Sequence, residues 1–139
     1  MKIILVGSSG QLGKSIIQKS PKNFQLLIPT KMEFNLRNSS ECFEYIIDNK
    51  PDWVINSGAY TNVDKAEEEE ELAYEINSKG PQFIAKALRE IGGKLLQIST
   101  DYVFNGCKST AYKVDDRVSP INHYGYTKAK AEELSLIHI

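Results

Sequence analysis

Two residues near the end of the chain, Tyr124 and Lys128, are four positions apart in the segment HYGYTK. On a helix this spacing places both side chains on one face. A phenol has a pKa of about 10 and relays protons poorly at neutral pH unless a nearby cation stabilises the phenolate form. A lysine one turn away supplies that cation, and its ammonium can also hydrogen-bond the ribose of a nicotinamide cofactor. The same spacing is common on helix surfaces, so its interpretation depends on the rest of the chain.

Polar side chains gather where a predicted strand ends, in the segment STDYVFNG over residues 99–106. In a doubly wound sheet, ligands collect at the carboxyl ends of the strands. We therefore expect the Thr100 hydroxyl to bind a substrate carbonyl beside Tyr124. The alternative for Thr100 and Asp101 is turn capping, in which their side chains satisfy the local backbone. The residues favour catalysis for Thr100, whereas Asp101 is a substrate-binding candidate with both roles open.

The segment GSSGQLG, with Gly7, Gly10 and Gly13, follows an apolar run at residues 2–6 and precedes a predicted helix. In this context the spacing is typical of a dinucleotide-binding loop. Gly7 permits a tight turn, Gly10 leaves room for a pyrophosphate, and Gly13 lets the helix pack closely on the sheet. The helix N-terminus adds free N–H groups for the phosphates. The alternative is a tight turn that binds no ligand.

The hydrophobic pattern predicts four strands that alternate with helices along the chain. The strands are expected at residues 2–6, 24–28, 53–58 and 94–99, and the helices at residues 11–20, 39–50, 63–92 and 124–139. Leu12, Ile16 and Ile17 share one face of the first helix. The element order implies a parallel sheet with right-handed crossovers. The predicted fold class is therefore α/β, a doubly wound parallel sheet of the Rossmann type, in one dinucleotide-binding domain over residues 1–139.

Several local features of these elements can also be predicted. Ser39 or Ser40 is expected to cap the second helix. The long third helix is expected to bend near Gly80-Pro81, where the proline removes a backbone donor. The carboxylates of Glu67–Glu71 are expected in the first helical turns, facing solvent at the positive end of the helix dipole. A loop is expected from Asn105 to about His123.

Composition narrows the classes of function. The chain has 139 residues, a net charge of −1, and 41% hydrophobic and 25% charged residues, which is ordinary for a soluble globular domain. No apolar run approaches a membrane span, and no charge excess favours nucleic acid or an anionic membrane. Cys42 and Cys107 lie far apart without a CxxC motif, which argues against a disulfide framework or a zinc site. We expect a cytoplasmic protein without a metal site, a nucleic-acid partner or a membrane partner.

The cofactor is expected to be NADPH or NADH. In the usual dinucleotide fold an acidic residue near the end of the second strand binds the ribose hydroxyls. Here Glu33 is the carboxylate in the segment PTKMEFNLRN, and Asn35 stands near the working position. Lys31 and Arg37 flank it, and such cations could admit a 2′-phosphate, so the residues leave NADP at least as plausible as NAD.

Five segments together resemble the extended short-chain dehydrogenase/reductase superfamily and, more narrowly, the dTDP-4-dehydrorhamnose reductase family. They are GSSGQLG, VINSGAYTNVDKAE, INSKGP, STDYVFNG and SPINHYGYTKAKAEE, and the resemblance covers residues 1 to about 133. The resemblance implies that the catalytic residues are Thr100, Tyr124 and Lys128. It implies cofactor contacts, besides those of Tyr124 and Lys128, at Gly7, Gly10, Gln11, Leu12, Asn35, Leu36, Ala59, Tyr60 and Thr61. Family members often have Asp-Leu at the positions of Asn35 and Leu36, which leaves the nucleotide preference open.

The resemblance also implies a reaction and a larger protein. The reaction is reduction of the 4-keto group of a dTDP-4-dehydro-6-deoxy sugar to give dTDP-L-rhamnose. Family members carry a smaller substrate domain after the Tyr/Lys helix, so the chain is expected to be truncated before that domain and inactive by itself. The last residues, 134–139, break the polar pattern of the helix and are interpreted as a non-native tail. A homodimer is expected for the full-length parent.

Two other functions remain open at this stage. Relatives in the same branch serve as non-catalytic regulatory subunits of methionine adenosyltransferase, and other extended family members are nucleotide-sugar epimerases or dehydratases. The presence of Thr100, Tyr124 and Lys128 together favours a reductase.

Overall fold

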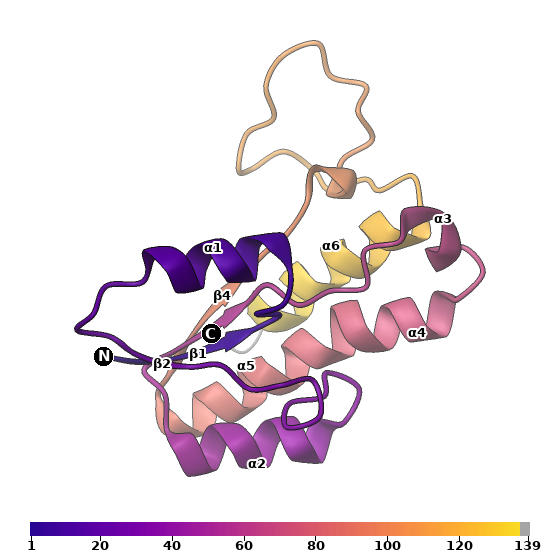
Figure 1. Ribbon diagram of the computed structural model, residues 1–139. Coiled ribbons are helices and arrows are strands. Elements are labelled where there is room, and N and C mark those ends of the chain that lie inside the picture. The colour runs from indigo at the N-terminus through magenta and orange to yellow at the C-terminus, as the bar shows by residue number, and fades with distance from the viewer. Residues whose placement is uncertain (137–139) are drawn as a thin grey trace.

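The computed structural model describes residues 1–136, which form a four-stranded parallel sheet with helices on both faces (Figure 1). The strands are β1 (Lys2–Val6), β2 (Gln25–Leu27), β3 (Trp53–Asn56) and β4 (Lys94–Gln97). Their spatial order is β2-β1-β3-β4, and each neighbouring pair is parallel. The predicted doubly wound α/β fold is confirmed, although the last three strands end earlier than expected.

The main hydrophobic core lies between one face of the sheet and two helices, α2 (Ser39–Asn49) and α5 (Gly80–Ile91). Ile4 and Val54 are paired in register on neighbouring strands and have no exposed surface. They pack with Ile46 of α2 and Ile84 of α5, which are also fully buried. Burial of each such side chain contributes about 1.5–3 kcal/mol relative to exposure, so this layer supplies much of the stability.

Helix α1 (Gln11–Lys19) lies on the opposite face of the sheet (Figure 1). Its buried residue is Gly13, whereas the expected apolar face remains partly accessible, with Leu12 43% and Ile17 38% exposed. Leu96 of the edge strand β4 is 47% exposed. This face of the sheet is therefore less completely covered than the face that carries α2 and α5.

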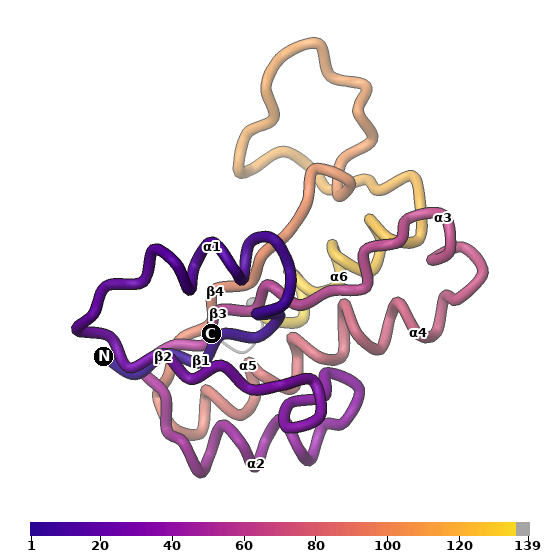
Figure 2. The backbone as a smooth tube through the Cα atoms, viewed as in Figure 1, coloured from indigo at the N-terminus to yellow at the C-terminus, as the bar shows by residue number. Residues whose placement is uncertain are grey.

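The prediction of a single helix over residues 63–92 is wrong. The chain forms α3 (Val63–Ala66), a corner, α4 (Glu70–Tyr74), a π-helical turn η1 (Glu75–Lys79) and then α5. Figure 2 shows the corner between α3 and α4 in the backbone trace. Two carboxylates hold it: Glu67 accepts a bond from the His123 amide at 2.7 Å, and Glu69 accepts one from the Tyr60 hydroxyl at 2.5 Å. His123 is 56 residues from Glu67 and neither partner lies in the predicted helix, so helical periodicity could not reveal the corner.

A bend is expected near Gly80-Pro81. The helix instead contains a π-helical turn immediately before these residues. The backbone of Tyr74 and Gly80 on either side of η1 is right-handed helical, so the chain continues without a break into α5. Pro81 has no N–H for the carbonyl one turn earlier, and a π-turn redistributes the hydrogen bonds around that vacancy.

The cap of α2 is Asn38, so the prediction of Ser39 or Ser40 is wrong by one or two residues. The Asn38 side chain accepts bonds from the amides of Ser40 at 3.2 Å and Glu41 at 3.3 Å. Asparagine and serine are similarly good caps, so residue type alone does not decide between neighbours.

The last helix, α6, runs from His123 to Leu136, and the part of the expected helix and tail at residues 137–139 lies outside the described residues. A short 3-10 turn, η2 (Asp101–Val103), precedes the expected loop, which extends away from the sheet in Figure 2. The Ser119 amide closes the base of this loop by donating to the Val103 carbonyl at 2.8 Å. Among residues 1–136, no helix is both long and apolar enough to cross a membrane.

We predict that Gly7→Ala destabilises the chain far more than Gly92→Ala. Both glycines have positive φ, 80° and 70°, but a Cβ at Gly7 would overlap the backbone of Gly58, whereas one at Gly92 meets nothing within 4 Å. Strained backbone alone should lower the free energy of unfolding at Gly92 by about 1 kcal/mol, and overlap at Gly7 should add about 1–3 kcal/mol. Urea unfolding measures both, and equal losses would contradict the close approach.

Candidate functional site

A cleft of about 320 Å³ opens at the carboxyl end of the sheet. The chain leaves β1 for β2 on one side and later returns to β3 on the other side of β1. Such a reversal separates the loops that follow the two strands, and ligands of doubly wound sheets bind in the resulting crevice. Six of the expected cofactor residues line it, namely Gly7, Gly10, Asn35, Leu36, Ala59 and Thr61.

The surroundings of the three glycines in the first loop differ in whether they leave room for a side chain. Gly7 packs on Gly58, and a Cβ at Gly13 would overlap the carbonyl of Gly7, so both are required by the protein itself. A Cβ at Gly10 would meet only the Gly7 carbonyl, at an ordinary 3.5 Å. Protein packing therefore does not require a glycine at position 10, and the open space above it fits the approach of a dinucleotide pyrophosphate.

Helix α1 begins directly at this cleft. Its N-cap is Gly10, which has no side chain to bond the free amides of the first turn. Unbonded N–H groups and the positive end of the helix dipole favour an anion at such a terminus. Gln11 and Leu12 are exposed in this first turn and lie outside the cleft lining, so their amides are nearer to the expected phosphate role than their side chains.

The far wall of the cleft is formed by the loop after β2. The Asn35 side chain accepts a bond from the Arg37 amide at 3.1 Å, which shapes the loop. Glu33 turns back on its own segment, accepting the Thr30 amide at 2.8 Å, and this bond lowers the pKa of the Glu33 carboxyl. Lys31 and Arg37 line the cleft, whereas Glu33 does not. The carboxylate of this loop is therefore directed away from the ribose position.

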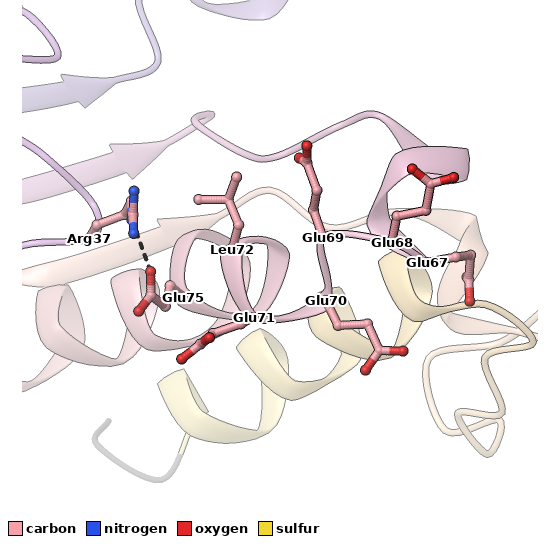
Figure 3. A pocket seen from close by; sticks show the side chains of 8 residues that line it. All are labelled: Arg37, Glu67, Glu68, Glu69, Glu70, Glu71, Leu72 and Glu75. Atoms are coloured by element: carbon pink, nitrogen blue, oxygen red, sulfur yellow. Dashed lines mark hydrogen bonds and ion pairs between the residues drawn. The ribbon is translucent and has the colours of Figure 1, made fainter.

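Arg37 also faces a second hollow, lined by Glu67–Glu71, Leu72 and Glu75 (Figure 3). Its guanidinium pairs with the Glu75 carboxylate at 2.9 Å. The carboxylates of Glu67–Glu71 are exposed, as expected, but only Glu70 and Glu71 lie in the first turn of a helix. In residues 1–136, no group of three or more potential ligand side chains is placed to hold a metal ion.

Helix α6 carries the tyrosine and the lysine, as the spacing predicts. Lys128 is 3% exposed, and its ammonium donates to the Ile98 carbonyl, just beyond β4, at 2.5 Å. Burial lowers the pKa of Lys128 to about 8, and the negative charge of Glu132 opposes this fall. Tyr124 is half-buried, with its ring edge against Tyr102 at a centroid distance of 5.7 Å.

The Thr100 side chain caps the turn η2, which is the alternative role considered for it. Its hydroxyl accepts the Tyr102 amide at 3.3 Å and donates to the Asp101 carboxylate at 3.2 Å. The turn packs on α6 at Gly125, where a Cβ would overlap the Tyr102 carbonyl. Gly125 therefore allows the Thr100 turn to lie against the helix that carries Tyr124.

Sequence reasoning missed Asn77, which connects the two sides of the site. This side chain is 1% exposed and makes three hydrogen bonds. It accepts the Tyr60 amide at 2.7 Å and donates to the Tyr60 carbonyl and the Thr127 hydroxyl, both at 3.0 Å. The signal available in the sequence was a pair of polar residues, Asn77 and Ser78, inside an otherwise amphipathic helical segment.

Tyr60 is positioned by this contact and does not line the cleft. Its backbone is held by Asn77, and its hydroxyl bonds Glu69, which raises the pKa of Tyr60 to about 12. Its neighbours Ala59 and Thr61 line the cleft, and the cofactor contact expected of Tyr60 stays a prediction.

The family model described as the RmlD substrate binding domain matches residues 1–136. The chain belongs to this family. The dTDP-4-dehydrorhamnose reductase of Aggregatibacter actinomycetemcomitans is 38% identical over 97% of this chain and 47% of its own length. This RmlD-family chain therefore spans about half the length of the curated relatives it matches.

Two solved structures share the geometry of this RmlD-family chain. The dTDP-4-dehydrorhamnose reductase of Clostridium acetobutylicum superposes with a TM-score of 0.95 at 38% identity, over 99% of this chain and 49% of that one. The reductase of Bacillus anthracis, solved in complex with NADP, superposes with a TM-score of 0.94 at 35% identity, over 98% of this chain and 49% of that one.

We predict that Lys128→Met stabilises the chain at pH 7. The folded-state pKa of about 8 lies below the ordinary lysine value of 10.5, so the buried ammonium destabilises the fold below pH 8, and this effect disappears as pH rises to 10.5. Methionine removes this charge, so it should raise the free energy of unfolding by about 1–3 kcal/mol at pH 7. The gain should be much smaller above pH 10.5, where lysine is neutral, and the unbonded Ile98 carbonyl reduces it at every pH.

Urea unfolding at several pH values checks this prediction. Lys130→Met is the matched control, because Lys130 lies on the same helix at the surface and pairs with Glu133. It should leave the free energy of unfolding nearly unchanged. A Lys128→Met variant that is less stable than wild type at pH 7 would show that the ammonium is stabilised in place.

Proposed function

We propose that this chain is the cofactor-binding and proton-relay part of a dTDP-4-dehydrorhamnose reductase, which reduces the 4-keto group of dTDP-4-dehydro-6-deoxy-L-mannose to give dTDP-L-rhamnose. The observation that carries the proposal is the arrangement of one sheet end, where the glycine-loop cleft lies on one side and the Tyr124–Lys128 helix on the other. The names of the relatives support it.

The cofactor in this proposal is NADPH or NADH. Gly10 and the first amides of α1 would hold the pyrophosphate, and the loop of Asn35 and Leu36 would hold the adenine ribose. Lys31 lines the same wall with no carboxylate directed at the ribose position, which favours a 2′-phosphate and hence NADPH. The NADP complex of the Bacillus anthracis relative is consistent with this preference.

When bound, the nicotinamide would supply the hydride. Tyr124 would donate the proton to the carbonyl oxygen, and Thr100 would hydrogen-bond the same oxygen once its hydroxyl exchanges Asp101 for the substrate. Asp101 would then line the substrate side. Lys128 has a pKa near 8 and is therefore mostly protonated at neutral pH, so it can stabilise developing negative charge and bond the nicotinamide ribose.

A non-catalytic regulatory role resembling that of the methionine adenosyltransferase subunit is less well supported. The relatives named above are reductases, and the chain retains Thr100, Tyr124 and Lys128. A cytoplasmic location, where nucleotide sugars and reduced cofactors are available, and a homodimer of the longer protein belong to the same proposal.

Cofactor binding is tested by Gly10→Val. The substitution should leave folding intact because the space above Gly10 is open, and it should weaken NADPH binding at least about tenfold by filling the pyrophosphate position. Nicotinamide fluorescence titration of the chain measures the Kd. Ser15→Val is the control, an exposed position on the same helix outside the cleft lining. Unchanged affinity in Gly10→Val would reduce the loop to a tight turn.

The proton-donor role is tested by Tyr124→Phe in a full-length protein that contains this chain. Loss of a general acid typically lowers kcat by about 10²–10⁴-fold, whereas the Kd for NADPH should change less than about threefold. Turnover is followed by the absorbance of the reduced cofactor with the 4-keto sugar nucleotide. A variant that retains near-wild-type kcat would remove Tyr124 from the reaction.

A further inference from the structure

Two consecutive residues beyond β4 contact α6 one helical turn apart. The Ile98 carbonyl accepts the ammonium of Lys128 at 2.5 Å, and the hydroxyl of the next residue, Ser99, donates to the carboxylate of Glu132. Lys128 and Glu132 are four positions apart, so they lie on the same face of the helix. The end of β4 is thereby attached to α6 at two points.

The charges around Lys128 indicate that this attachment also affects the protonation of its amine. Its ammonium is buried and bonds a neutral carbonyl, not a carboxylate. Glu132 is the charged group that acts on it, and its negative charge favours the protonated amine. Ser99 holds that carboxylate toward the strand end.

The other elements packed on α6 contribute few charges near this position. From η1, Asn77 and Ser78 bond Thr127 and are neutral, whereas Glu75 pairs with Arg37 and Lys79 is exposed. From η2, Tyr102 faces Tyr124, and the exposed Asp101 carboxylate bonds the Thr100 hydroxyl.

The other helices packed on α6 carry their charged side chains at exposed positions, which in α3 and α4 are Asp64, Lys65, Glu70 and Glu71. The buried side chains of α5 are apolar, and its Lys86, Arg89 and Glu90 are exposed. In the corner between α3 and α4, the Glu67 carboxylate bonds the His123 amide at the far end of α6 from Glu132.

We propose that Ser99 and Glu132 are a positioning pair for Lys128: Glu132 supplies a charge that favours the protonated form of the buried amine, and Ser99 fixes both Glu132 and the Ile98 carbonyl relative to it. The catalytic meaning of the pair rests on the proposed function. Its electrostatic effect on Lys128 does not, because it follows from contacts within this chain.

The test is the titration of Lys128 by NMR on the chain with isotope-labelled lysine. Glu132→Gln keeps an acceptor for the Ser99 hydroxyl but removes the charge. The titration midpoint of Lys128 should fall by roughly half a pH unit or more. Glu133→Gln is the matched control, since Glu133 is the next residue and pairs with Lys130, and it should leave the midpoint of Lys128 unchanged.

A folded Glu132→Gln variant with the wild-type midpoint would overturn the proposal. If that variant does not fold, Glu132→Ala decides in the same way. Like glutamine, alanine removes the charge, so a lowered midpoint supports the proposal and an unchanged one overturns it.

The role of Ser99 is tested by a double-mutant cycle. Ser99→Ala should lower the urea midpoint of the wild-type chain and change it little when Glu132 is already alanine, because the two residues act through one bond. Equal effects in both backgrounds would show that Ser99 does not act through Glu132. None of these measurements requires cofactor, so a failure of NADPH binding would count against the proposed function alone.

Discussion

The carboxamide of Asn77 is the contact on which the assembly of the site depends. Its three hydrogen bonds join the loop after β3, through both backbone groups of Tyr60, to the helix of Tyr124 and Lys128, through Thr127. Because the amide is almost completely buried, each lost bond would leave an unpaired polar group in the interior, which is more costly than the bond itself. The distance between the cleft and the helix of Tyr124 and Lys128 is therefore fixed by a polar contact. The π-helical turn places this side chain between the two segments.

Close contacts between backbone segments fix the positions of two other parts of the site. Gly7 lies against Gly58 where the chain reverses beside β1, and Gly125 lies against the carbonyl of Tyr102 where η2 meets α6. Backbone that packs directly on backbone has little freedom to adjust, so these two places define the loop that would hold a pyrophosphate and the turn that carries Thr100. Gly10 differs because nothing in the chain occupies its side-chain space. Within one loop, packing accounts for two glycines, and the third lies beside open space that the proposed ligand would fill.

The electrostatics of α6 show a buried charge that is only partly compensated. An ammonium with 3% exposure destabilises the folded chain at neutral pH, and a carboxylate one turn away reduces that effect without forming the direct partner. Functional groups held in unfavourable surroundings are common at active sites, where stability is given up for reactivity. The glutamates of the corner between α3 and α4 serve a different purpose. Glu67 bonds the first amide of α6 and Glu69 bonds Tyr60, so surface carboxylates help to orient both parts of the site.

The sequence by itself determined the alternation of strands and helices, the parallel doubly wound fold and the placement of Tyr124 and Lys128 on one helix. These depend on short-range periodicity and on glycine spacing, which are local properties of the chain. The tertiary structure alone decided which residues bind one another across long separations. The contact of Glu67 at the corner, the bonds of Asn77 and the burial of Lys128 each require a partner far along the chain. Such pairs leave no periodic pattern, because their geometry exists only after the sheet has brought distant segments together.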